Sequence, residues 1–184
     1  EAAIKLHESV ASKLEIIDKI VIRTQEPAIR IISKVGKLAN AADRDHCIQY
    51  MVAVGLIFGD LIAEYYEDDF HQENQLIDKL RDKMIIEEDN QFSMDYLDPE
   101  KRSIANAVQV FFNDGTCSDD IQIEYPIGHK KRREEGIPLL EEKFWNNLNA
   151  CFDKDKSKLI YDLCLDQEKL EKTKVHEFME LFVK

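Results

Sequence analysis

The segment that most restricts the fold is 104–126, with the sequence IANAVQVFFNDGTCSDDIQIEYP. Apolar and polar residues alternate on both sides of an Asn-Asp-Gly turn, which is the pattern of two antiparallel strands joined as a β-hairpin. Val108, Val110 and Phe112 would share one face of the first strand. The segment therefore predicts an antiparallel hairpin with one apolar face.

The residues before the hairpin contain both strand and helix patterns. After a helical pattern over the first fifteen residues, the alternating run IDKIVIRT (17–24) predicts a strand that ends before Pro27. The run AIRIIS (28–33) predicts a second short strand. Residues 36–45 are predicted to form a loop.

A long apolar stretch predicts the central helix of this region. It covers about residues 46–66, and Asp43 or Asp45 would cap its N-terminus. Its apolar run MVAVGLIFGDLIA (51–63) is too short to span a membrane and is interrupted by Asp60, so it predicts a buried helix. An amphipathic helix is predicted over 74–84, whereas 91–103 is predicted to be a loop.

The last part of the sequence is helical throughout. Pro138 suits the first turn of a helix, and two further helices are predicted over 155–165 and 168–183. The expected fold class is α+β. Helices would pack on a small antiparallel sheet in residues 1–133, and C-terminal helices would follow in residues 134–184.

Composition excludes several classes of partner. The 184 residues carry a formal net charge of -12, so neither nucleic acid nor an anionic membrane is expected as a general partner. The four cysteines are scattered without a CxxC pair, which disfavours structural zinc or an iron–sulfur cluster. Reduced thiols and the lack of a signal peptide predict a cytoplasmic protein without a metal site.

The beginning of the sequence suggests that more of the protein precedes it. The chain opens inside a helical pattern, without an initiator methionine or an N-cap residue before Glu1. We therefore expect it to be a fragment of a longer polypeptide.

Three candidate substrate-binding residues lie near the start of the predicted central helix. Arg44, His46 and Tyr50 could converge at its N-terminus, where an anion is stabilised. The alternative is structural, because a capping or core histidine explains the position of His46 without a ligand.

The other two candidates, His129 and Lys130, lie in the basic run GHKKRR at 128–133. Gly128 permits a sharp turn that would expose the imidazole, and lysine or arginine could hold a carboxylate. The alternative is a solvated cationic hinge that Glu134 and Glu135 neutralise.

Long stretches of the sequence resemble one family of enzymes. They are SKLEIIDKIVIRTQEPAIRIISKVGKLANAADRDHCIQYMVAVGLIFGDL, DYLDPEKRSIANAVQVFFNDG, EYPIGHKKRREEGIPLLEEKF and DLCLDQEKLE. Together they resemble the C-terminal portion of enzymes of the MmgE/PrpD family. The resemblance implies that residues 1–133 are most of an α+β lid domain. Residues 134–184 would be the terminal helices of a larger helical domain.

The resemblance also implies an activity. It points to a hydro-lyase that removes water from 2-methylcitrate to give 2-methyl-cis-aconitate, in the methylcitrate cycle of propionate catabolism. Such enzymes would need neither a metal nor an iron–sulfur cluster, would be homodimers, and would bind a small tricarboxylate. The main catalytic residues are expected before residue 1, so this chain alone would be inactive.

Two other interpretations remain open from the sequence. One is a related decarboxylase or epimerase that acts on polycarboxylates within the same superfamily. The other is a non-catalytic interaction module whose exposed faces are domain interfaces.

Overall fold

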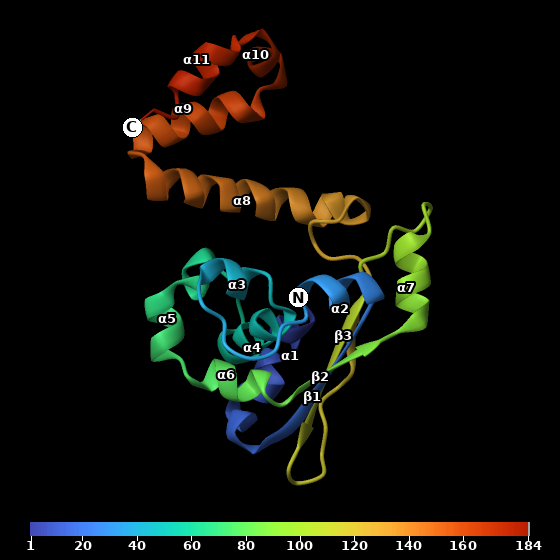
Figure 1. The fold of residues 1–184 in the computed structure, drawn as a ribbon. Coiled ribbons are helices and arrows are strands. Elements are labelled where there is room, and N and C mark those ends of the chain that lie inside the picture. The colour runs from blue at the N-terminus through green and yellow to red at the C-terminus, as the bar shows by residue number, and fades with distance from the viewer. Residues whose placement is uncertain (184) are drawn as a thin grey trace. The chain divides into compact units, whose positions relative to one another are not determined.

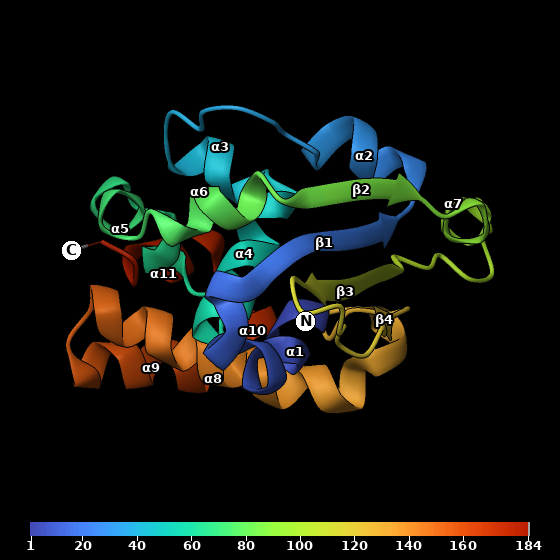
Figure 2. The ribbon, with the colours of Figure 1, turned by 90° about the horizontal axis from the view of Figure 1, so that it is seen from below.

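A four-stranded mixed sheet with the strand order β2-β1-β3-β4 forms the centre of the first part of the chain (Figure 2). β1 pairs in parallel with β2 and antiparallel with β3, and β3 pairs antiparallel with β4. The predicted hairpin and the strand predicted at 17–24 are therefore confirmed. The strands are β1 (Ile17–Thr24), β2 (Met84–Glu88), β3 (Asn106–Phe112) and β4 (Ile121–Ile123).

The computed structural model describes residues 1–183, and the chain divides into two compact units, Glu1–Pro126 and Ile127–Lys184. The first unit mixes helices with the sheet and the second is helical, so the α+β class is confirmed. The assignment of residues 1–133 to a lid and of 134–184 to a helical domain stays a prediction.

The expectation of a purely antiparallel sheet was wrong in one respect. β2 runs parallel to β1, and a parallel pair requires a long crossover connection between its strands. Helices supply that crossover between Thr24 and Met84. They are α2 (Glu26–Ile32), α3 (Ala41–Asp45), α4 (Ile48–Phe58), η2 (Ala63–Tyr66), α5 (Asp68–Glu73) and α6 (Leu76–Arg81).

Three short segments differ from their predicted conformation. Residues 36–45 are not a loop throughout, because they include α3. Residues 28–33 do not form a strand, because α2 begins at Glu26 and Pro27 occupies its first turn, where a proline is well tolerated. Residues 91–103 are not a loop throughout, since α7 (Asn90–Leu97) lies there. The side chain of Asp89 caps α7 by accepting hydrogen bonds from the backbone N–H groups of Gln91 (2.9 Å) and Phe92 (3.2 Å).

The central helix is buried as predicted but shorter than predicted. α4 ends at Phe58, because Gly59 adopts a left-handed conformation with a φ of 71° and donates its N–H to the carbonyl of Gly55. Neither Asp43 nor Asp45 caps α4. Its N-cap position is occupied by Cys47, whereas Asn40 caps α3 by accepting from the N–H of Asp43.

The main hydrophobic core of the first unit lies between the sheet and its helices. α1 (Ala2–Val10), which η1 (Ala11–Ile16) follows, and α6 both pack against α4. Figure 1 shows these helices grouped beside the strands. Leu56 of α4, Ile20 of β1 and Val110 of β3 are all fully buried in this core. α4 is therefore the helix that the sheet and the other helices enclose.

The second unit consists of η3 (Lys130–Arg132) and four helices. They are α8 (Arg133–Cys151), α9 (Lys154–Leu165), α10 (Gln167–Lys172) and α11 (Val175–Glu180). The helix predicted at 155–165 is confirmed, whereas the one predicted at 168–183 is divided in two, because Thr173 and Lys174 are extended.

The start of α8 also differs from the prediction. Pro138 lies inside the helix and not in its first turn, because the helix already begins at Arg133. Near the N-terminal end of α8, position 136 requires a glycine, because a Cβ atom there would lie 2.4 Å from the carbonyl oxygen of Ile127. The chain before the helix therefore approaches the helix backbone more closely than a side chain would allow.

No helix within residues 1–183 is both long enough and apolar enough to cross a membrane.

The end of α4 provides a test of the fold. A Cβ atom on Gly59 would lie 2.7 Å from Cδ2 of His7, and the left-handed backbone is itself unfavourable for alanine. We expect Gly59→Ala to lower the free energy of unfolding by about 2 kcal/mol, measured by urea denaturation.

The matched control is Gly36→Ala. Gly36 has a similar φ of 82°, but no atom would lie within 4 Å of the added Cβ. This variant should lose only the backbone contribution of about 1 kcal/mol. Equal losses in the two variants would contradict the predicted contact with His7.

Candidate functional site

Arg44 is a buried cation in the first unit. Its side chain is 2% exposed, and its Nε donates a hydrogen bond of 2.6 Å to the carbonyl oxygen of Tyr66. A terminal nitrogen of the guanidinium pairs with the carboxylate of Asp68. These contacts attach α3 to η2 and to the start of α5, and they commit part of the guanidinium to structural bonds.

Tyr50 lies in the same region and is fully buried on α4. Its hydroxyl donates a hydrogen bond of 2.7 Å to the carbonyl oxygen of Tyr65, and its ring stacks on that of Tyr66 at a centroid distance of 6.0 Å. Burial raises the pKa of Tyr50 to about 12. Tyr50 is therefore a neutral hydrogen-bond donor at physiological pH and not a base.

His46 differs from its two neighbours. Its side chain is 62% exposed, and its Nδ1 lies 3.4 Å from a carboxylate oxygen of Asp45. Arg44 of α3 and Tyr50 of α4 thus both donate hydrogen bonds to backbone carbonyl groups of η2. His46 follows the last residue of α3 and lies at the surface. Of these three candidates, only His46 is exposed.

The remaining candidates belong to the second unit. His129 occupies the N-cap position of η3, where its Nδ1 accepts a hydrogen bond of 3.2 Å from the N–H of Lys131. Lys130 is exposed. Arg132 pairs with Glu135 at 2.8 Å, so one cation of the basic run is neutralised locally, as the hinge interpretation requires.

A second, partly buried polar cluster lies next to Tyr50, and the sequence patterns did not predict it. His71 contacts the ring edge of Tyr50, and its Nε2 lies 3.0 Å from Oδ2 of Asp78. The other oxygen of Asp78 accepts from Arg81, which also donates a hydrogen bond of 3.0 Å to the carbonyl oxygen of Gly36. The sequence did contain one indication of this ion pair: Asp78 and Arg81 are three residues apart in a predicted helix, a spacing that places two side chains on the same face.

These contacts give the second cluster a structural role. Arg81 is buried and links α6 to the loop that leads into α3. Across residues 1–183, no group of three or more histidine, cysteine, aspartate or glutamate side chains is arranged to hold a metal ion.

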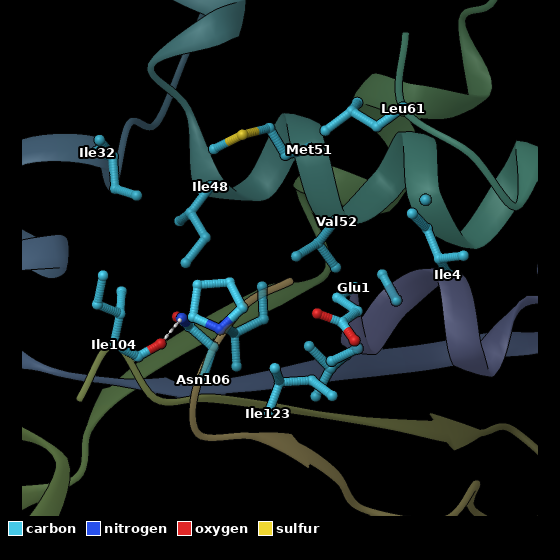
Figure 3. Close-up of a pocket in the computed structure, with 16 residues that line it drawn as sticks. Glu1, Ile4, Ile32, Ile48, Met51, Val52, Leu61, Ile104, Asn106 and Ile123 are labelled. Carbon is cyan, nitrogen blue, oxygen red and sulfur yellow. Dashed lines mark hydrogen bonds between the residues drawn. The ribbon is translucent and has the colours of Figure 1, made fainter. Parts of the chain in front are cut away.

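A hollow of about 230 Å³ opens in the first unit (Figure 3). Its walls come from α1, α4 and the sheet, and most of the lining side chains are aliphatic. The polar exceptions are Glu1 and Asn106. The amide of Asn106 donates a hydrogen bond of 3.0 Å to the carbonyl oxygen of Ile104, and its carbonyl oxygen accepts one of 2.7 Å from Thr24.

None of the five predicted substrate-binding residues lines this hollow. Its lining is contributed by several short segments that are far apart in the sequence. Each contributes aliphatic residues that look like ordinary core positions. Only the tertiary structure gathers them around one space.

Comparison with known proteins relates the chain to one family. The model of the MmgE/PrpD C-terminal domain matches residues 1–167. The chain is 50% identical to 2-methylcitrate dehydratase of Salmonella typhimurium and 49% identical to that of Escherichia coli. Both comparisons cover 100% of this chain and 38% of the relative.

A fungal alkylcitrate dehydratase is 42% identical over 93% of the chain, which corresponds to 33% of that relative. The chain therefore spans less than two fifths of the length of these relatives. The family match covers most of the chain, and identity to the bacterial relatives extends along all of it. The chain belongs to the MmgE/PrpD family, and its residues 1–167 match the C-terminal domain of that family.

Proposed function

We propose that this chain is part of a hydro-lyase that dehydrates 2-methylcitrate to 2-methyl-cis-aconitate, a step of the methylcitrate cycle in propionate catabolism. The observation that supports this most is identity of about one half, along the whole chain, to two bacterial proteins named 2-methylcitrate dehydratase. No second activity is favoured by an observation of comparable weight.

Removal of water from such a substrate requires three kinds of group. A base takes the proton next to a carboxylate, cationic donors stabilise the developing negative charge, and an acid protonates the departing hydroxyl. Tyr50 cannot supply the base, because its high pKa keeps it neutral. We infer that the proton-transfer residues lie in other parts of the polypeptide.

The role that we propose for the first unit is that of a lid. A lid excludes water and completes the binding site when it closes over the substrate. We propose that His46 of this unit contacts a substrate carboxylate. His129 and Lys130, which belong to the second unit, are separate candidates for a carboxylate contact. Arg44 and Tyr50, whose hydrogen bonds join neighbouring elements, would instead hold the segment around His46 in place.

The partner that we propose for the second unit is the remainder of its own polypeptide. Among the residues that the structure describes there, only Leu148 and Ile160 are buried hydrophobic residues, and large apolar side chains are exposed. The exposed side chains include Leu140 (65%), Leu159 (56%) and Val175 (79%). Such a surface is typical of a segment that packs against another domain. A homodimer and a cytoplasmic location stay predictions.

The activity can be tested with the complete protein. We expect 2-methylcitrate to produce a rise in ultraviolet absorbance, because the product contains a carbon–carbon double bond conjugated with a carboxylate. The isolated chain of residues 1–184 should give no rise. Mass spectrometry of the product would identify 2-methyl-cis-aconitate.

Other products would contradict the proposal. Release of carbon dioxide, or of a stereoisomer of the same mass as the substrate, would indicate the decarboxylase or the epimerase. Tight tricarboxylate binding by residues 1–184, without turnover by the complete protein, would indicate a non-catalytic module.

The contact proposed for His46 can be tested separately. A hydrogen bond to a charged carboxylate contributes about 1.5–3 kcal/mol, so His46→Ala should lower kcat/KM for 2-methylcitrate at least about tenfold. His176→Ala is a matched control, since His176 is also exposed (68%) and also lies beside an acidic residue, Glu177. The control should retain full activity. An unchanged kcat/KM in His46→Ala would remove His46 from the binding site.

A further inference from the structure

The hollow in the first unit is suited to a hydrocarbon group. Its volume is about 230 Å³, and an apolar cavity of about 150 Å³ is already large enough to bind benzene. In Figure 3 the side chains of Ile48, Met51 and Val52 extend from α4 toward the hollow, and that of Ile123 lies across it. Its lining thus offers dispersion contacts and removal of apolar surface from water.

The two polar residues of the lining do not change this character. Both amide atoms of Asn106 are engaged, one with the carbonyl oxygen of Ile104 and the other with the hydroxyl of Thr24. The carboxylate of Glu1 lies 3.7 Å from the ammonium group of Lys5, which balances its charge. Asn106 thus has a partner for each of its amide atoms, which lowers the cost of burying this side chain among aliphatic neighbours.

The hollow extends along one side of α4. Its lining residues on this helix run from Ile48, the first residue, through Met51 and Val52 to Gly55. Among the described residues that line it, Glu1 is the charged one. An uncharged alkyl group is therefore the part of a ligand that this lining accommodates.

We propose that the hollow is the subsite for the alkyl substituent of a 2-alkylcitrate substrate, and that Val52 and Ile123 set the length of the chain that it accepts. This inference rests on the proposed dehydration. The names of the relatives fit such a site, because one acts on a methylcitrate and another on an alkylcitrate. A methyl group fills only a small part of the hollow, which leaves room for several further methylene groups.

The test uses the complete enzyme with 2-methylcitrate, 2-ethylcitrate and 2-butylcitrate. Each methylene group that enters the hollow should favour the longer substrate, by up to about fourfold in kcat/KM. Val52→Phe fills the hollow, so it should lower the ratio of kcat/KM for 2-butylcitrate over 2-methylcitrate by at least about tenfold.

A matched control separates filling of the hollow from a general disturbance. Ile57→Phe makes a similar change on the same helix at a partly buried residue that does not line the hollow, and it should leave the ratio unchanged. If circular dichroism shows that Val52→Phe is unfolded, Ile123→Trp provides the same test from β4, where the side chain is half-buried.

The outcomes distinguish the two proposals. If the wild-type enzyme converts 2-methylcitrate but rejects 2-butylcitrate, another part of the polypeptide fills the hollow, and the subsite proposal is wrong. Equal losses for both substrates in folded Val52→Phe and Ile123→Trp would also overturn it. If the wild-type enzyme converts none of the three substrates, the proposed dehydration itself fails.

Discussion

Burial of α4 is the constraint on which the rest of the first unit depends. This helix is apolar on most sides, and eight of its eleven residues are buried. Each fully buried aliphatic side chain contributes about 1.5–3 kcal/mol, so the helix is stable only if it is enclosed. The sheet, α1 and α6 provide that enclosure. The passage through α4 also belongs to the long connection that the parallel pairing of β1 with β2 requires.

The polar residues around α4 complete this enclosure. Arg44 and Arg81 are charged side chains at buried positions, and each is bonded to an aspartate and to backbone carbonyl groups. A buried cation is tolerated when such partners replace water. The two arginines thereby tie η2 and the loop before α3 to the core. We infer that they hold the surface segment carrying His46 in a defined conformation.

Prediction from the sequence succeeded where the pattern was local. The alternation in 104–126 and in 17–24 predicted three strands of the sheet, and the apolar run after Cys47 predicted the buried helix. It failed at β2, a short run whose strand conformation depends on pairing with the distant β1. It also failed at residues 28–33, where an isoleucine-rich run suggested a strand although Pro27 favours the start of a helix.

At the candidate site, too, local patterns were predictable from the sequence and long-range contacts were not. The sequence by itself determined the family, the α+β class and the chemical types that could bind a carboxylate, because long literal stretches and local periodicity carry that information. Only the tertiary structure decided that Arg44 and Tyr50 are engaged inside the protein while His46 is exposed. It also decided that aliphatic residues of α1, α4 and the sheet surround one hollow. The reason is physical: burial and cavities are set by contacts between segments far apart in the sequence, and local residue patterns do not record those contacts.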